Sequence, residues 1–188
     1  MNLKIFDTKI IVPTKCGTRY CEQIFPTYVH GWDWNWYHDN QILTESYWMI
    51  YRHPMEHLIS ALQTEMLMVF NGLDTISMEG VLDKFISTGG TTHYSNQICQ
   101  DIYLHWERNP IYFHPIELGD LTKTLQTLGY PTIEFDASDY SFSNLPIVRT
   151  KEECLFFLKL HYPQYWNTLL SYVEKDIPYY QKLQEQCK

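Results

Sequence analysis

The segment from Lys9 to Phe25 carries the clearest chemical signal in the chain. An apolar run at Ile10–Val12 favours a buried strand, and it leads through a glycine turn into an expected helix. Gly17 permits a close backbone approach to a ligand, and the unpaired N–H groups that open a helix attract anions. Because Lys15 adds a positive charge, the turn predicts an anion-binding site. It is not a Walker loop, since Lys15 precedes Gly17, and similar turns occur in α/β proteins that bind no phosphate.

The elements around this turn are expected to alternate between strands and helices. Short apolar and aromatic runs favour strands, and apolar residues at helical spacing favour helices. The expected strands are Ile10–Val12, a short strand and loop at Tyr28–Gly31, Glu45–Tyr51, Ile111–His114 and Ile133–Phe135. The expected helices are Thr18–Phe25, Pro54 to Asn71, Ser77 to Gly89, Leu118–Gly129, Thr150–Tyr162, and Gln164–Gln186 with a break near Pro178. Strands that are separated by helices imply a parallel α/β sheet.

Composition excludes several classes of protein. The length of 188 residues suits a single domain over 1–188 with a sizeable core. A formal net charge of −8 argues against a nucleic-acid surface and favours a compact positive pocket for a small anion. The five cysteines form no Cys-x-x-Cys pair, and their odd number suits a reducing compartment. Because no run has membrane-spanning length and no signal-peptide core is present, we expect a cytoplasmic protein without membrane contact.

Two segments resemble, in collinear order, the donor-binding motifs of the sulfotransferase family. Pro13-Thr-Lys-Cys-Gly-Thr18 resembles the Pro-Lys-x-Gly-Thr-Thr/Ser loop for the 5′-phosphosulfate of 3′-phosphoadenosine 5′-phosphosulfate (PAPS). Tyr51-Arg-His-Pro-Met-Glu-His-Leu-Ile-Ser60 resembles the Arg-Asp/Asn-Pro-x-x-Arg-x-x-Ser segment for the 3′-phosphate. Segments that resemble carbohydrate sulfotransferase motifs are His93–Gln97, Ile116–Leu121 and Tyr172–Tyr179, and Tyr28–Gly31 is similar to the base segment of the uronyl 2-O-sulfotransferases.

The resemblance implies an enzyme that moves a sulfuryl group from PAPS to a hydroxyl acceptor. It implies an α/β, P-loop-like three-layer fold with a mainly parallel sheet of about four to five strands flanked by helices. The donor-binding residues that it implies are Lys15, Cys16, Gly17, Thr18, Arg19, Arg52 and Ser60. Lys15 would stabilise the departing phosphate, while Arg52 and Ser60 would hold the 3′-phosphate. Without the family context, Arg52 reads as a surface ion pair and Ser60 as a buried hydroxyl.

The turn and the helix after Arg52 depart from the family pattern. Thr14 is inserted before Lys15, Arg19 replaces the second Thr or Ser, and His57 replaces the usual second arginine. Arg19 is placed to add a phosphate contact, because it belongs to the first helical turn.

A histidine base is expected to take the proton of the acceptor hydroxyl. His30 is the first choice because its position matches that of the family's base, His38 is the second and His93 the third. A purely structural histidine is the alternative at each position. The aromatic residues between Tyr28 and Tyr51 suit a small-molecule or carbohydrate acceptor, although core packing is the better explanation for most of them.

Two other functional classes stay open. One is a non-catalytic nucleotide-binding or interaction module on the same scaffold. The other is a zinc hydrolase, because His53-Pro-Met-Glu-His57 matches a His-x-x-Glu-His peptidase pattern. That pattern needs both histidines on one continuous helix, whereas Pro54 favours an extended conformation at His53. We therefore expect no metal site.

Overall fold

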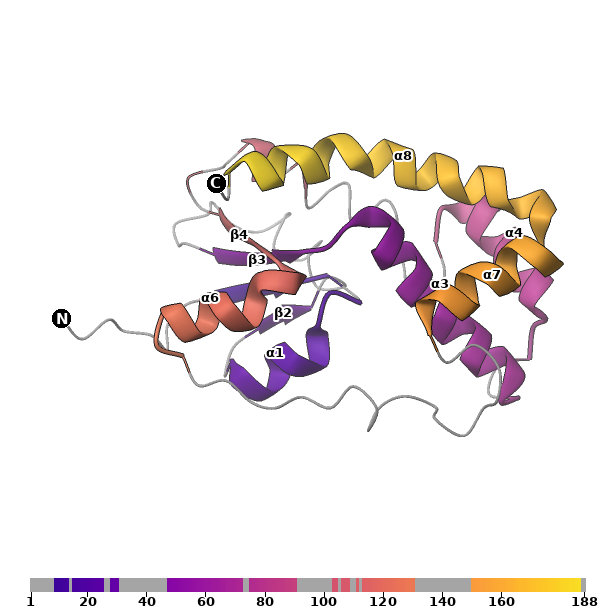
Figure 1. The fold of residues 1–188 in the computed structure, drawn as a ribbon, viewed down its shortest axis with the longest axis horizontal. Helices are drawn as coiled ribbons and strands as arrows, with labels where there is room; N and C mark the ends of the chain where they lie inside the picture. Colours follow the sequence, from indigo (N-terminus) through magenta and orange to yellow (C-terminus); the bar gives the residue numbers. More distant parts are fainter. Residues whose placement is uncertain are drawn as a thin grey trace. The chain divides into compact units, whose positions relative to one another are not determined.

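The computed structural model describes residues 9–13, 15–25, 28–30, 47–72, 75–90, 103–104, 106–108, 111, 113–130 and 150–186 (Figure 1). The chain forms two compact units. Unit 1 contains Met1–Arg52, Ile98–Glu134 and Tyr179–Lys188, and unit 2 contains His53–Gln97 and Phe135–Pro178. The expected single domain over 1–188 stays a prediction. None of the helices in these described ranges is long and apolar enough to cross a membrane.

Unit 1 is built on a β-sheet with the strand order β2-β1-β3-β4, and every pairing in it is parallel. The strands are β1 (Lys9–Val12), β2 (Tyr28–His30), β3 (Tyr47–Tyr51) and β4 (Phe113–Glu117). Because β1 lies between β2 and β3, its apolar residues Ile10 and Ile11 are fully buried. The expected α/β class with a parallel sheet is confirmed.

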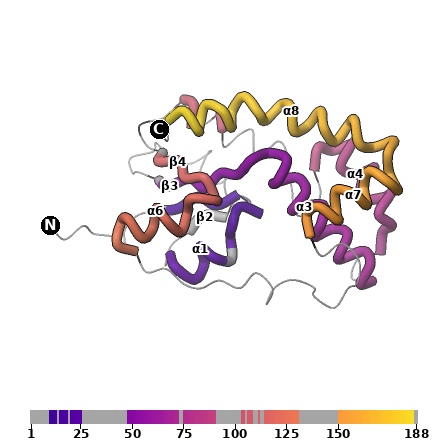
Figure 2. Tube along the Cα trace, in the orientation of Figure 1, coloured from indigo at the N-terminus to yellow at the C-terminus, as the bar shows by residue number. Residues whose placement is uncertain are grey.

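The helices of unit 1 come from distant parts of the sequence. They include α1 (Thr18–Ile24), a short 3₁₀ turn η4 (Leu118–Asp120), α6 (Leu121–Thr127) and the end of α8 (Pro163–Gln186). α1 and α6 lie side by side in Figures 1 and 2, and the Tyr20 hydroxyl is 3.4 Å from Thr122 Oγ1. This contact joins the helix that follows β1 to the helix that follows β4.

Aromatic residues of β3 show that both faces of the sheet are covered. The Trp48 ring centroid lies 6.4 Å from that of Phe25 and 5.4 Å from that of Tyr130, which follow α1 and α6 respectively. The Tyr51 ring centroid lies 5.8 Å from that of Tyr180 in α8. Since side chains alternate along a strand, Trp48 and Tyr51 point to opposite faces. α1 and α6 therefore pack on one face, and the end of α8 packs on the other.

Unit 2 is helical. It contains α3 (Pro54–Phe70), α4 (Met78–Thr88), α7 (Lys151–His161) and the first part of α8. α3 packs against α4 and α7, and the fully buried Cys154 of α7 lies 3.5 Å from the sulfur of Met66 in α3. The Tyr172 hydroxyl on α8 donates to the Ile86 carbonyl on α4 at 3.0 Å. These contacts give unit 2 a core of its own.

Capping residues in the sequence correctly predicted where α4 and α7 of unit 2 begin and where α4 ends. The Ser77 hydroxyl accepts a hydrogen bond from the Gly80 N–H at 3.2 Å at the start of α4, which ends at Gly89 with φ 71°. Thr150 and Glu153 form the expected capping box at the start of α7. The expected positions of both helices are confirmed.

Three expectations about element bounds need correction, and a fourth falls on residues that the structure does not describe. The strand expected at Ile111–His114 is observed at Phe113–Glu117, so it contains Pro115. A proline is tolerated there because β4 pairs only with β3 in the described sheet. A 3₁₀ turn occupies the start of the helix expected at Leu118, and α6 begins after it. The break expected near Pro178 is wrong, since α8 continues through it. The strand expected at Ile133–Phe135 lies outside the described residues.

Candidate functional site

The turn between β1 and α1 has a constrained backbone. The Cys16 N–H donates to the Pro13 carbonyl at 2.9 Å, which closes the turn directly after the strand. Lys15 adopts a positive φ of 66°, a left-handed conformation that few residues other than glycine tolerate. Gly17 also has a positive φ, 83°, and is the N-cap of α1. The backbone at two positions of this turn is therefore held in a conformation that is costly for ordinary side chains.

The space around Gly17 also favours a residue without a side chain. A Cβ atom on Gly17 would lie 2.7 Å from Cδ1 of Leu118, far inside a normal van der Waals contact. Leu118 follows directly after β4, so the end of that strand lies against the turn. The expectation that Gly17 lets a ligand approach the backbone closely stays a prediction.

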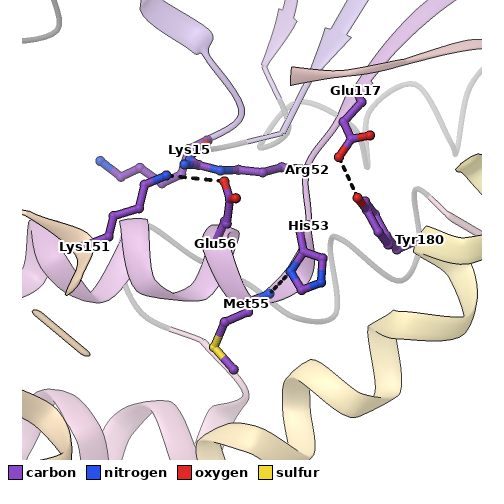
Figure 3. Close-up of polar contacts among 8 residues, drawn as sticks. All are labelled: Lys15, Arg52, His53, Met55, Glu56, Glu117, Lys151 and Tyr180. Atoms are coloured by element: carbon purple, nitrogen blue, oxygen red, sulfur yellow. Dashed lines mark hydrogen bonds and ion pairs between the residues drawn. The ribbon is translucent and has the colours of Figure 1, made fainter. Parts of the chain in front are cut away.

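Arg52 reaches the same turn from the end of β3. Its guanidinium Nη1 donates to the main-chain oxygen of Lys15 at 2.9 Å, and its side chain extends toward Lys15 in Figure 3. Arg52 is only 9% exposed, so this hydrogen bond forms in a largely desolvated position. The structure thus brings together, within unit 1, residues from the two segments that the sequence singled out.

Thr18 carries an unsatisfied polar atom at the start of α1. Its Oγ1 is buried and has no hydrogen-bond partner among the described residues. A buried hydroxyl without a partner costs about 1–3 kcal/mol, so such an atom needs an explanation. Thr18 is also the first helical residue after Gly17, which provides no side-chain cap for α1. A ligand oxygen bound at the turn would satisfy this hydroxyl.

Cys16 is not suited to act as a nucleophile. It is 1% exposed, and burial raises the pKa of its thiol to about 12, although the positive charge of Arg52 acts in the opposite direction. Burial likewise raises the pKa of Cys21 to about 12. Because the thiolate is the reactive form of cysteine, both residues are inert thiols at neutral pH. Any contact of Cys16 with an anion therefore involves its main chain.

The other predicted site residues can be assigned to a helix or strand, or lie outside the described residues. His30 is the last residue of β2 and pairs with Val12, so its main chain lies next to the point where the turn leaves β1. Arg19 belongs to the first turn of α1. Ser60 lies in α3, within unit 2, so its pairing with Arg52 stays a prediction. His38 and His93, the other candidates for the base, lie outside the described residues.

The zinc-peptidase pattern does not form its usual geometry. α3 begins at Pro54, and His53 is its N-cap residue with φ −52° and ψ 128°, as the sequence predicted. The Nδ1 atom of His53 accepts a hydrogen bond from the Met55 N–H at 3.2 Å (Figure 3). His53 therefore precedes the helix that carries His57. Within the described ranges, no group of three or more His, Cys, Asp and Glu residues is arranged to hold a metal ion.

A polar cluster that the sequence did not predict lies at the end of β4. The Tyr180 hydroxyl donates to Glu117 Oε1 at 2.6 Å, as Figure 3 shows, and Gln184 Nε2 lies 2.8 Å from the Tyr180 oxygen. Glu117 and Tyr180 each fall within or beside segments that resemble sulfotransferase motifs, but no local pattern links them. The sequence expectation ended this strand at His114, and the structure places Glu117 at its carboxyl end, where α/β proteins bind ligands.

Comparisons with known proteins leave the function of this site to be argued from its own residues. No protein-family model, curated protein or solved structure matches the chain.

Proposed function

We propose that the protein is a PAPS-dependent sulfotransferase that transfers a sulfuryl group to a hydroxyl acceptor, with a carbohydrate as the favoured class. The single observation that carries this proposal is the hydrogen bond from Arg52 to the Lys15 carbonyl, at 2.9 Å. It joins the two segments that resemble the 5′-phosphosulfate and 3′-phosphate motifs. A surface ion pair, the alternative for Arg52, does not explain a buried guanidinium aimed at this turn.

The architecture of unit 1 supports a P-loop-like, three-layer arrangement. Its sheet is parallel, helices cover both faces, and the turn follows the carboxyl end of β1. Ligands of open α/β sheets bind outside the carboxyl ends of the strands, which is where Lys15 and Arg52 lie. The expected sheet of about four to five strands belongs to the same proposal.

The proposed reaction is an in-line displacement at sulfur. The acceptor oxygen attacks sulfur while the bond from sulfur to the bridging oxygen of the 5′-phosphate breaks, and the hydroxyl proton passes to His30. Lys15 neutralises the charge that develops on the departing phosphate, and the Thr18 hydroxyl donates to a phosphate oxygen. Positioning and fixed charges supply most of the rate acceleration, as they do in phosphoryl transfer.

Arg52 has two roles in this proposal. Its hydrogen bond fixes the Lys15 peptide in its left-handed conformation, and its positive charge lies beside the 3′-phosphate of the donor. The resemblance also assigns Ser60 of α3 to the 3′-phosphate, and because Ser60 belongs to unit 2, that role stays a prediction.

The test is a sulfate-transfer assay with radiolabelled PAPS and a panel of carbohydrate, phenolic, small-alcohol and peptide-tyrosine acceptors. We expect transfer to a carbohydrate hydroxyl by the wild type and none by the Lys15→Ala variant. PAPS binding without transfer to any acceptor would favour the alternative, a non-catalytic nucleotide-binding module. Absence of both binding and transfer would contradict the proposal.

A further inference from the structure

Three side chains form a hydrogen-bonded cluster at the carboxyl end of β4. Glu117 is the last residue of the strand and pairs in register with Tyr51. Its Oε1 atom accepts from the Tyr180 hydroxyl at 2.6 Å, and its Oε2 atom lies 3.4 Å from Gln184 Nε2. Gln184 Nε2 also donates to the Tyr180 oxygen at 2.8 Å. Because that oxygen accepts from Gln184, the Tyr180 proton is directed at the carboxylate.

Glu117 depends on these neutral donors for its position. It has no ion-pair partner among the described residues, so the short hydrogen bond from Tyr180 is its strongest polar contact there. Tyr180 itself is rigidly held, since it is 8% exposed and its ring packs against Tyr51. The end of α8 therefore fixes the end of β4.

The residue after β4 in turn lies against the turn between β1 and α1. Leu118 follows Glu117 directly, and its Cδ1 atom occupies the space that a Cβ on Gly17 would need. The segment touches α1 again one turn later, where Thr122 Oγ1 is 3.4 Å from the Tyr20 hydroxyl. Neighbouring residues therefore lead from Tyr180 in α8, through Glu117 and Leu118, to Gly17 in the turn.

We propose that Tyr180 is a positioning residue for the turn between β1 and α1, acting through Glu117 and Leu118. Arg52 donates a hydrogen bond to the turn at the Lys15 carbonyl, and the Leu118 side chain lies against the turn beside Gly17. The inference rests on the proposed function only for the identity of the ligand. The contacts of Tyr180, Glu117 and Leu118 do not depend on which ligand binds at the turn.

The experiment compares Tyr180→Phe with Tyr172→Phe. Both changes remove one hydrogen-bonded hydroxyl from α8, but the Tyr172 hydroxyl donates to the Ile86 carbonyl in unit 2. Amide hydrogen exchange is measured for peptides that cover residues 13–21, and affinity for 3′-phosphoadenosine 5′-phosphate (PAP) is measured by calorimetry. We expect Tyr180→Phe to speed exchange in the turn by about fivefold and to weaken PAP binding by a similar factor. Tyr172→Phe should change neither quantity.

A second pair of variants separates positioning from a general loss of stability. Glu117→Gln keeps an oxygen that accepts from Tyr180, so we expect it to preserve slow exchange in the turn, whereas Glu117→Ala should not. Equal exchange in the turn for Tyr180→Phe and Tyr172→Phe would overturn the inference, as would equal exchange for the two Glu117 variants. If the wild type fails to bind PAP, the proposed function fails, and the exchange data still decide the role of Tyr180.

Discussion

The guanidinium of Arg52 donates a hydrogen bond to the main-chain oxygen of Lys15 across 2.9 Å. The contact is possible because β1 and β3 are parallel neighbours, paired at Ile11 and Met49, so that both chains leave the sheet at the same edge. It links a buried cation to a peptide with positive φ, in a turn that lacks the Walker sequence. Anion binding at this turn would therefore depend on a residue from the neighbouring strand as well as on the turn itself.

Variants at Lys15 should distinguish the role of its ammonium group in transfer from the cost of its backbone conformation. Lys15→Ala keeps the positive φ with its cost of about 1 kcal/mol, whereas Lys15→Gly removes that cost from the folded state. We expect both variants to fold and to lose sulfate transfer, with Lys15→Gly at least as stable as Lys15→Ala by denaturant titration. Normal transfer in either variant would remove the Lys15 ammonium group from the mechanism.

Gly17→Ala should be more damaging than Gly129→Ala. Both glycines have positive φ, 83° and 78°, but a Cβ on Gly129 meets nothing within 4 Å. We expect Gly129→Ala to cost about 1 kcal/mol and Gly17→Ala to cost about 1 kcal/mol more, because Leu118 must move. Urea denaturation gives both values. If Leu118→Ala fails to relieve the extra cost in the double variant, the Leu118 side chain does not limit the space at Gly17.

Thr18→Val should stabilise the free protein and weaken ligand binding. Valine has nearly the same shape as threonine and removes the buried hydroxyl that lacks a partner among the described residues. We expect the free energy of unfolding to rise by about 1 kcal/mol and PAP affinity to fall, whereas Thr18→Ser should retain the affinity. A loss of stability in Thr18→Val without ligand would show that the hydroxyl is already satisfied.

The buried thiols predict a loss of stability at alkaline pH. Burial raises the pKa of Cys16 and of Cys154 from 9.0 to about 12. Between these values the folded state keeps a proton that the unfolded state has lost, so the free energy of unfolding falls as pH rises from 9 to 12. Replacing either cysteine by alanine should make this decline shallower. An unchanged slope in both variants would mean that these thiols ionise alike in the two states.

Much of the fold could be predicted because its signals are local. Ser77, Gly89 and Thr150 define helix ends through contacts with residues a few positions away, and Ile10–Val12 reads as a buried strand. The continuation of α8 through Pro178 could not be read from the proline alone. Proline removes one helical hydrogen bond and crowds the preceding turn, but packing along a long helix can outweigh that cost.

The site was predictable only in part, because several of its contacts join residues that are far apart in the sequence. The turn at Lys15 and Gly17 has a recognisable sequence. The hydrogen bond that Arg52 donates to it is accepted by a main-chain oxygen, which every residue type has, so no sequence pattern marks this contact. Glu117 and Tyr180 are 63 positions apart, so no periodicity relates them. Such contacts follow from the strand order and from the return of α8 to the sheet, which single-sequence patterns do not encode.

The most direct test of the central claim is a calorimetric titration of PAP into the wild type, Arg52→Ala and Arg108→Ala. Arg108 is an exposed arginine of unit 1 and serves as the control for a simple loss of charge. We expect the wild type and Arg108→Ala to bind PAP alike, and Arg52→Ala to bind at least about tenfold more weakly. Equal affinity in all three proteins, or no binding to the wild type, would contradict the account.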